Sequence, residues 1–192
     1  PRIGVYVCDC GVNISATVDV EEVVAFATRL PGVVVARENK YMCSEPGQKM
    51  IQDDIRDLGL TRVVVASCTP RMHETTFQNA IAEADLNPYY FSMAKIREQV
   101  SWIVQDPTQA TAKAKRLVSS ATHRVALQDP LVSRQEPVTK AALVVGGGIA
   151  GIPSALTLAE AGYPTYLVER EPTIGGHMAQ LDKTFPTLDC ST

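Results

Sequence analysis

The chain has 192 residues, of which 45% are hydrophobic and 20% are charged, and its formal net charge is −3. This length and balance suit one large or two small globular domains with a buried core. The small negative charge and the 6% aromatic content give no basis for binding nucleic acid. No apolar run approaches the ~20 residues needed to span a bilayer, and no signal-peptide pattern opens the chain. We therefore expect a cytoplasmic protein with no membrane span.

The first two thirds of the chain alternate between short apolar strand patterns and amphipathic helix patterns. Such alternation predicts an α/β fold with a parallel sheet that is covered by helices on both faces. Thr69 and Pro70 have the residue types of a helix N-cap and first helical position. The expected elements are, in order, Arg2–Val7, Val18–Leu30, Gly32–Ala36, Pro46–Leu58, Arg62–Ser67, Arg71–Ala84, Tyr89–Met93, Ile96–Val104 and Pro107–Leu127.

A polar, proline-containing stretch separates this region from a second pattern. Residues 129–140 include two prolines and many polar side chains, which is typical of a linker. The expected organisation is an α/β domain over residues 1–130, a linker over 131–140 and an incomplete nucleotide-binding domain over 141–192.

The second pattern is a nearly complete dinucleotide-binding motif. The apolar strand Ala141–Val145 leads into Gly146, Gly148 and Gly151 at G-x-G-x-x-G spacing, and the next strand, Pro164–Val168, ends at an acid. The glycines allow a tight turn, close approach of a pyrophosphate and close helix packing, and the acid would bind ribose hydroxyls. A glycine-rich turn without a ligand is the alternative. The residues expected to contact the cofactor are Gly146, Gly148, Ile149, Ala150, Gly151, Glu169, Arg170, Gly175, Gly176 and His177.

The residues after Glu169 bear on which dinucleotide is bound. An acid followed within a few residues by Gly175 and Gly176 resembles the flavoproteins that have two dinucleotide-binding domains. In those proteins this segment follows the adenosine and pyrophosphate of FAD. We therefore expect FAD, with NAD as the second choice.

Four cysteines, Cys8, Cys10, Cys43 and Cys68, follow or end three successive strands. Ligands of parallel sheets gather at the carboxyl ends of the strands, so we expect these thiols at one edge. Four soft ligands suit a [4Fe–4S] cluster or a tetrahedral zinc. The spacing is neither that of a bacterial ferredoxin nor that of a zinc knuckle, and we favour the cluster. Thiol–disulfide chemistry or plain packing are the alternatives.

Four long blocks of the sequence resemble the A subunit of heterodisulfide reductase and its relatives. They are residues 4–14 (GVYVCDCGVNI), 41–44 (YMCS), 66–73 (ASCTPRMH) and 175–186 (GGHMAQLDKTFP). The family consists of cytoplasmic iron–sulfur flavoproteins of anaerobes, which carry FAD in a thioredoxin-reductase-like domain and several [4Fe–4S] clusters. Its members pass electrons between partner subunits, in many cases by flavin-based bifurcation.

The resemblance implies specific roles for residues of this chain. Gly146, Gly148, Gly151 and Glu169 would bind the ADP half of FAD. The four early cysteines would be ligands of an N-terminal cluster, and Cys190 resembles the first cysteine of a further cluster motif. Only the first β-α-β of the flavin domain is present, so we expect a fragment or one part of a split pair that does not turn over alone.

The predicted function is therefore that of an electron-transfer segment, with no catalytic side chain of its own. Expected partners are other subunits of a heterodisulfide-reductase-like complex and the remaining flavin and ferredoxin modules, with a homodimer as one further assembly. The rival prediction is a docking or assembly module with structural thiols or zinc. A pyridine-nucleotide disulfide oxidoreductase is disfavoured, because no redox C-x-x-C is present.

Overall fold

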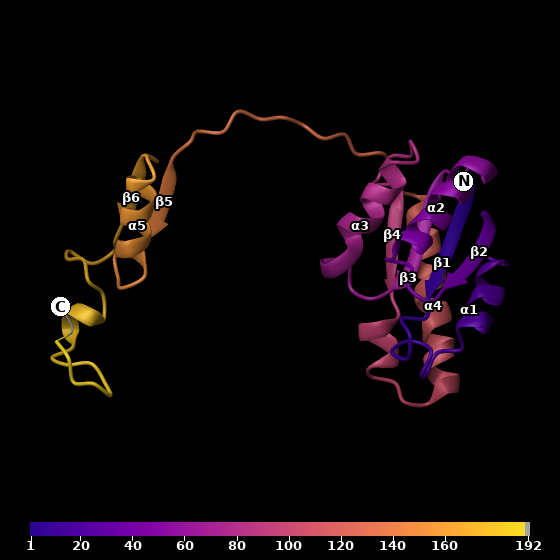
Figure 1. The fold of residues 1–192 in the computed structure, drawn as a ribbon, viewed down its shortest axis with the longest axis horizontal. Coiled ribbons are helices and arrows are strands. Elements are labelled where there is room, and N and C mark those ends of the chain that lie inside the picture. Colours follow the sequence, from indigo (N-terminus) through magenta and orange to yellow (C-terminus); the bar gives the residue numbers. More distant parts are fainter. Residues whose placement is uncertain (191–192) are drawn as a thin grey trace. The chain divides into compact units, whose positions relative to one another are not determined.

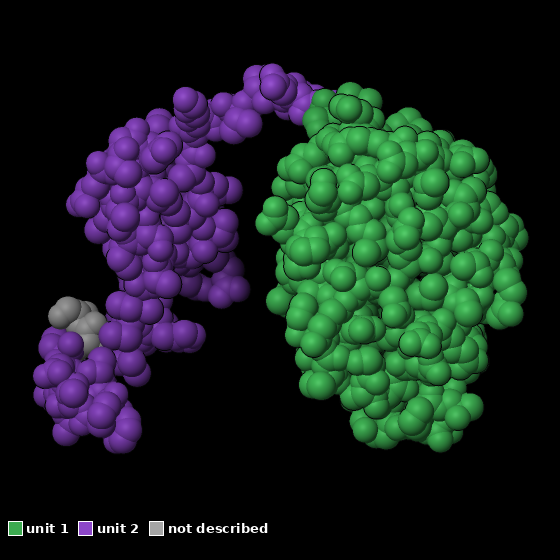
Figure 2. Space-filling view, turned by 45° about the vertical axis from the view of Figure 1, so that its right-hand side comes forward, with its two compact units in different colours: residues 1–133 green, residues 134–192 purple. Residues whose placement is uncertain are grey.

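The structure is a computed structural model that describes residues 1–190 of the chain. The chain divides into two compact units, Pro1–Ser133 and Arg134–Thr192 (Figure 2). Residues 128–141 contain no helix or strand. The first unit holds the larger sheet and the second holds a single β-α-β motif.

The first unit is built on a parallel sheet of four strands, β1 (Ile3–Cys8), β2 (Val33–Asn39), β3 (Arg62–Ser67) and β4 (Phe91–Lys95). The strand order is β2-β1-β3-β4 (Figure 1). All six residues of β1 are buried, which explains why a strand in the middle of the sheet is apolar without alternation. The expected parallel α/β fold is confirmed.

Helices cover this sheet in two pairs. Helix α1 (Val20–Ala27) packs against α4 (Pro107–Ala126), and α2 (Glu45–Leu58) packs against α3 (Pro70–Ala82) (Figure 1). Helix α4 also lies along β3 and β4. Its buried side chains are mostly small and recur at helical spacing, so the helix approaches the sheet closely. They are Ala110, Thr111, Ala114, Val118, Ala121, Thr122 and Val125.

Local hydrogen bonds set where the helices begin. The Asp19 carboxylate accepts from the Glu22 N–H at 2.9 Å, and this cap starts α1 at Val20, two residues after the predicted start. The Thr69 hydroxyl accepts from the Arg71 N–H, with Pro70 as the first residue of α3, which confirms the predicted cap. The predicted strand Arg62–Ser67 matches β3 at both ends, and the other predicted and observed element ends differ by at most three residues.

The helical stretch predicted over Ile96–Val104 is helical only in part. The segment contains only a five-residue π-helical turn, η1 (Arg97–Ser101). The N–H groups of Ser101 and Trp102 donate to carbonyls five residues back, and the Ile96 N–H is instead bonded to Ser67 of the sheet. Because the chain is still tied to β3 at Ile96, it leaves the sheet through a wide turn rather than a regular helix.

A buried polar group joins the sheet to α2. The Tyr6 hydroxyl donates to Asp54 at 3.1 Å, and Arg37 makes two bonds to the same carboxylate at 2.7 and 2.9 Å. Burial raises the pKa of Tyr6, and the Asp54 charge adds to that rise, so the phenol stays protonated as a donor. The three residues hold β1, β2 and α2 in one arrangement.

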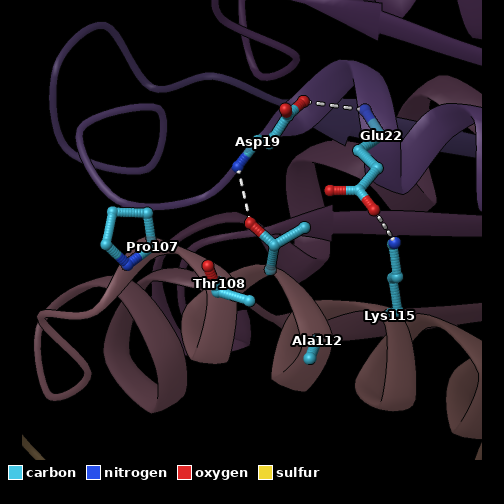
Figure 3. Close-up of a pocket in the computed structure, with 7 residues that line it drawn as sticks. Asp19, Glu22, Pro107, Thr108, Ala112 and Lys115 are labelled. Atoms are coloured by element: carbon cyan, nitrogen blue, oxygen red, sulfur yellow. Dashed lines mark hydrogen bonds and ion pairs between the residues drawn. The ribbon is translucent and has the colours of Figure 1, made fainter.

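A hollow of about 280 Å³ lies where α1 begins beside α4 (Figure 3). The Asp19 N–H donates to the Thr111 hydroxyl at 2.9 Å, and Lys115 is ion-paired with Glu22. These polar groups are satisfied by one another, so the hollow is explained as a junction between two helices and we assign it no ligand.

The second unit consists of β5 (Ala142–Val145), α5 (Gly151–Glu160), β6 (Thr165–Val168) and the short 3-10 turn η2 (Met178–Gln180). Strands β5 and β6 pair in parallel. Helix α5 ends just before Gly162, which has the positive φ of 85° expected from a helix-terminating glycine.

Candidate functional site

Three adjacent parallel strands bring four thiols to one edge of the first sheet. Cys8 is the last residue of β1, Cys43 precedes α2 in the turn after β2, and Cys68 directly follows β3. Cys10 lies two residues beyond β1. Cys8 and Cys68 are buried, whereas Cys10 and Cys43 are half-buried. The four cysteines therefore lie along one edge of the sheet, as predicted.

The environment of Cys8 is apolar, with directed donors. Burial raises the pKa of this thiol to about 11, while N–H groups of Met42 and Cys10 lower it and the neighbouring Cys10 and Cys43 raise it. The Met42 N–H reaches the Cys8 Sγ at 3.5 Å. Donors of this kind stabilise a thiolate or a metal-bound sulfur. Because burial outweighs these donors and the pKa is raised, the Cys8 thiol favours its protonated form, and a bound metal cation would have to replace that proton.

A left-handed turn positions Cys10. Cys10 has φ 50° and Gly11 has φ 60°, and the Asn13 N–H closes the turn on the Cys10 carbonyl at 3.0 Å. Positive φ is uncommon for a residue with a side chain and has a conformational cost.

The four thiols influence one another electrostatically but are not arranged as a closed ligand set. Burial raises the pKa of Cys68, and Cys43 and Cys10 contribute to the rise. Within residues 1–190 no group of three or more His, Cys, Asp or Glu side chains forms a metal-binding cluster. Binding of a shared metal centre would therefore require the thiol side chains to converge.

A glycine in α2 supports the Cys43 turn. A Cβ added at Gly47 would lie 2.5 Å from the Met42 carbonyl oxygen, so only glycine allows α2 to start this close. We expect G47A to destabilise the first unit by about 2 to 3 kcal/mol through this overlap. Urea unfolding followed by circular dichroism measures the effect.

The matched control is G59A. Gly59 ends the same helix with φ 58° and no atom near an added Cβ, so alanine there has only a conformational cost of about 1 kcal/mol. Equal losses of stability in G47A and G59A would contradict the packing role of Gly47.

In the second unit, the glycine-rich turn lies between β5 and α5. Gly146 has φ 103°, and an added Cβ at Gly151 would overlap the Gly146 carbonyl oxygen. An added Cβ at Gly148 would meet nothing within 4 Å. No described side chain caps the start of α5, where the Ile152 N–H donates to the Gly148 carbonyl at 3.0 Å and Pro153 has no N–H.

Glu169 folds back onto this turn. One carboxylate oxygen accepts from the Gly147 N–H at 2.6 Å, and the other accepts from Arg170 and Glu171 at 2.7 and 3.0 Å. These backbone donors, with Glu171 and Gly147 first, hold the pKa of Glu169 below its ordinary value of 4.5. Gly147 was not singled out from the sequence, although its N–H is the link between the turn and the acid.

We expect this link to titrate in the acid range. Because the pKa of Glu169 is lowered by folding, its contribution to local order is complete above pH 4.5 and is lost as the pH falls through the lowered pKa. The Gly147 amide resonance should shift with a midpoint below pH 4.5. In E169Q that transition should be absent, and its persistence would assign the titration to another group.

The second glycine pair, Gly175 and Gly176, contacts the glycine-rich turn that precedes α5. The Gly175 N–H donates to the Gly147 carbonyl at 2.6 Å, and Gly176 packs on Gly148. Ile149, Ala150 and Arg170 are exposed around the turn, and exposed His177 precedes η2. An apolar hollow of about 450 Å³ adjoins the glycines and includes residues that the motif did not indicate. It is lined by Ile149, Ile152, Pro153, Ile174, Gly175, Met178 and Ala179.

Cys190 belongs to the second unit and not to the group of four. It is exposed and pairs with Lys183 in an isolated antiparallel bridge. Its expected part in a further cluster motif stays a prediction. Among the described residues, no helix is both long enough and apolar enough to cross a membrane.

Comparison with known proteins gives matches along the whole chain. The family model for FAD dependent oxidoreductases matches residues 142–185. The second iron-sulfur A subunit of CoB–CoM heterodisulfide reductase from Methanopyrus kandleri is 58% identical over all of this chain and 29% of its own length. In Methanothermobacter thermautotrophicus, the A subunit of H(2):CoB–CoM heterodisulfide,ferredoxin reductase is 56% identical over the same shares.

A further relative, from Archaeoglobus profundus, is named as a protein like the heterodisulfide reductase A subunit. It is 54% identical over all of this chain and 27% of its own length. The chain thus spans less than a third of the curated relatives that it matches. The resemblance identified from the sequence is confirmed: the chain is similar to the N-terminal portion of heterodisulfide reductase A subunits.

Proposed function

We propose that this chain is an electron-transfer segment that binds the ADP half of FAD in its second unit and a [4Fe–4S] cluster in its first. When bound, FAD supplies two-electron chemistry and an iron–sulfur cluster supplies one-electron chemistry. The observation that carries the proposal is the position of Cys8, Cys10, Cys43 and Cys68 at or just after the carboxyl ends of three adjacent strands, along one edge of the sheet.

The second unit suits FAD through its open turn. Gly148 leaves room for a pyrophosphate at the start of α5, where no described side chain caps the helix and the helix dipole favours an anion. Glu169 stays ionised at neutral pH and can accept hydrogen bonds from ribose hydroxyls. The match to FAD dependent oxidoreductases supports this assignment over NAD.

The first unit suits a cluster through its donor set. Four thiols are the ligands that a [4Fe–4S] cluster requires, and Met42 offers a backbone N–H to the Cys8 sulfur. The iron–sulfur subunit named among the relatives supports iron over zinc. Within a larger assembly, electrons would pass between flavin, clusters and partner subunits, with bifurcation as the finer form of this proposal.

Anaerobic reconstitution of the 192-residue chain with iron and sulfide tests the cluster. We expect about four irons and four acid-labile sulfides per chain, broad absorption near 400 nm and an electron paramagnetic resonance signal after reduction. Zinc binding, or four titratable thiols without iron, would reject the cluster.

A second candidate is a docking module with structural thiols. Cys8 packs in the apolar core, and its sulfur already contacts Met42 and the Lys40 carbonyl. Together with the lack of a closed ligand set among residues 1–190, this favours a packing role for at least this cysteine. The same metal analysis separates the two candidates.

A further inference from the structure

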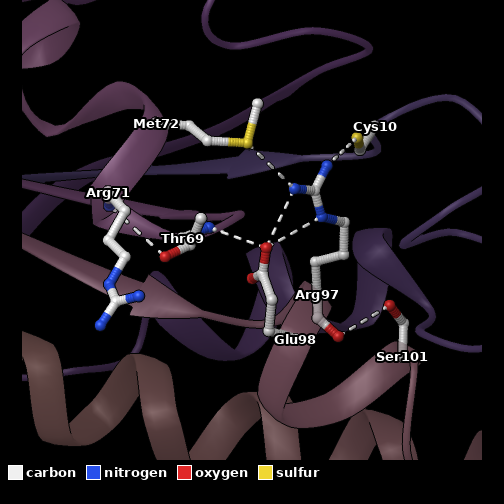
Figure 4. Close-up of polar contacts among 7 residues, drawn as sticks. All are labelled: Cys10, Thr69, Arg71, Met72, Arg97, Glu98 and Ser101. Carbon is white, nitrogen blue, oxygen red and sulfur yellow. Dashed lines mark hydrogen bonds and ion pairs between the residues drawn. The ribbon is translucent and has the colours of Figure 1, made fainter. Parts of the chain in front are cut away.

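The guanidinium of Arg97 lies among the sulfur atoms at the sheet edge (Figure 4). One terminal nitrogen, Nη1, donates to the Cys10 Sγ at 3.5 Å, and the other, Nη2, reaches the Met72 Sδ at 3.7 Å. The same charge lowers the pKa of Cys68 against the effect of burial. Arg97 therefore acts on two of the four thiols, which come from different strands.

Glu98 and Trp102 fix the position of this guanidinium. A single Glu98 oxygen accepts from Nε and Nη2 of Arg97 at 3.1 and 2.9 Å, and it also accepts from the Thr69 N–H at 3.1 Å. The guanidinium carbon lies 4.9 Å from the centre of the Trp102 ring, and the Arg97 side chain is only 14% exposed. Because Thr69 follows Cys68 directly, Glu98 ties the Cys68 loop to Arg97.

The backbone conformation brings Arg97 to this place. Arg97 begins the π-helical turn η1, two residues after β4, so it lies at the same carboxyl-end edge as the cysteines. π-Helical turns are uncommon and occur often at functional sites. Glu98 binds the Nε and Nη2 side of the guanidinium, which leaves Nη1 directed at Cys10. The positive member of the Arg97–Glu98 ion pair therefore faces the Cys10 sulfur.

On this basis we propose that Arg97 is a positioning residue that raises the reduction potential of the cluster held by the four cysteines. The inference rests on the proposed function. Adding one electron to a thiolate-held cluster adds one negative charge, and a fixed cation with an N–H···S contact stabilises the more negative state. Arginine remains protonated throughout, so no proton accompanies the electron at this residue.

The test is a redox titration of the reconstituted 192-residue chain, with dithionite as the one-electron donor and the paramagnetic signal as the readout. In R97Q we expect the ratio of oxidised to reduced cluster at a fixed potential to rise about tenfold, which is about 59 mV for one electron. The shift includes the effect of Glu98, whose charge would no longer be compensated. The double variant R97Q/E98Q should therefore shift less than R97Q.

The matched control is R71Q. Arg71 is exposed, lies at the start of α3 and directs its guanidinium away from Arg97 (Figure 4). R71Q removes the same charge from the same region, and its cluster should keep the wild-type potential. If R97Q and R71Q have equal potentials, the inference is overturned while the cluster itself stands.

Two further outcomes are decisive. If R97Q does not retain iron, R97K decides: it keeps the charge without the planar fork, so its potential should lie at or slightly below that of the wild type, and a potential above the wild type or more than about 59 mV below it overturns the inference. If the wild-type chain binds no iron, the proposed function is overturned and this inference with it. Circular dichroism of every variant separates these results from misfolding.

Discussion

G151A is expected to disrupt the turn of the second unit and to abolish FAD binding. An added Cβ would overlap the Gly146 carbonyl oxygen, and the Val144 side chain lies 3.5 Å away on the same side. Helix α5 would have to move away from β5, and overpacking of this kind costs about 1 to 3 kcal/mol. We expect at least about tenfold faster hydrogen exchange of α5 amides, together with loss of FAD in equilibrium dialysis.

G148A is the control that separates folding from binding. An added Cβ at Gly148 meets no atom within 4 Å, so the exchange of α5 amides should stay at the wild-type rate. The methyl group would nevertheless occupy the space that a pyrophosphate needs, and FAD affinity should fall by about tenfold or more. Wild-type FAD binding by G148A would show that the phosphates do not approach this turn.

The sheet and its edge could be predicted from the sequence because burial and chain connectivity decide both. Strands β1 and β3 are buried on both faces, so their apolar runs are continuous, and each is followed by a capped helix. Parallel strands must end at one edge, and this is why the cysteines could be placed together. These properties depend on residue types and not on exact geometry.

The details of the candidate site could not be predicted in the same way. The π-helical turn at Arg97 depends on hydrogen bonds to residues five positions back and on the tie from Ile96 to Ser67. Neither kind of hydrogen bond produces a periodic pattern in the amino-acid sequence. The separation of the sulfurs depends on the positive φ of Cys10 and on side-chain rotamers. The cysteines were located by the rule that ligands gather after the carboxyl ends of parallel strands. The same rule, applied to the residues after β4, would have indicated Arg97.

Replacement of any one of the four edge cysteines by alanine is expected to remove most of the iron from the reconstituted chain. The variants are C8A, C10A, C43A and C68A. A [4Fe–4S] cluster is held by four thiolates, and alanine offers no ligand atom. Iron content should fall from about four per chain to well below one, with loss of absorption near 400 nm.

C190A is the matched control. Cys190 belongs to the second unit, and a single cysteine of a further motif cannot hold a cluster alone, so the iron content of C190A should be unchanged. The buried variant C8A should also lose about 1 kcal/mol of stability from its small cavity, whereas the half-buried C10A should not. Thermal unfolding of the metal-free chains measures this difference. If C8A alone keeps its iron, Cys8 is a packing residue and the cluster has another fourth ligand. If all four variants keep their iron, these thiols do not hold it.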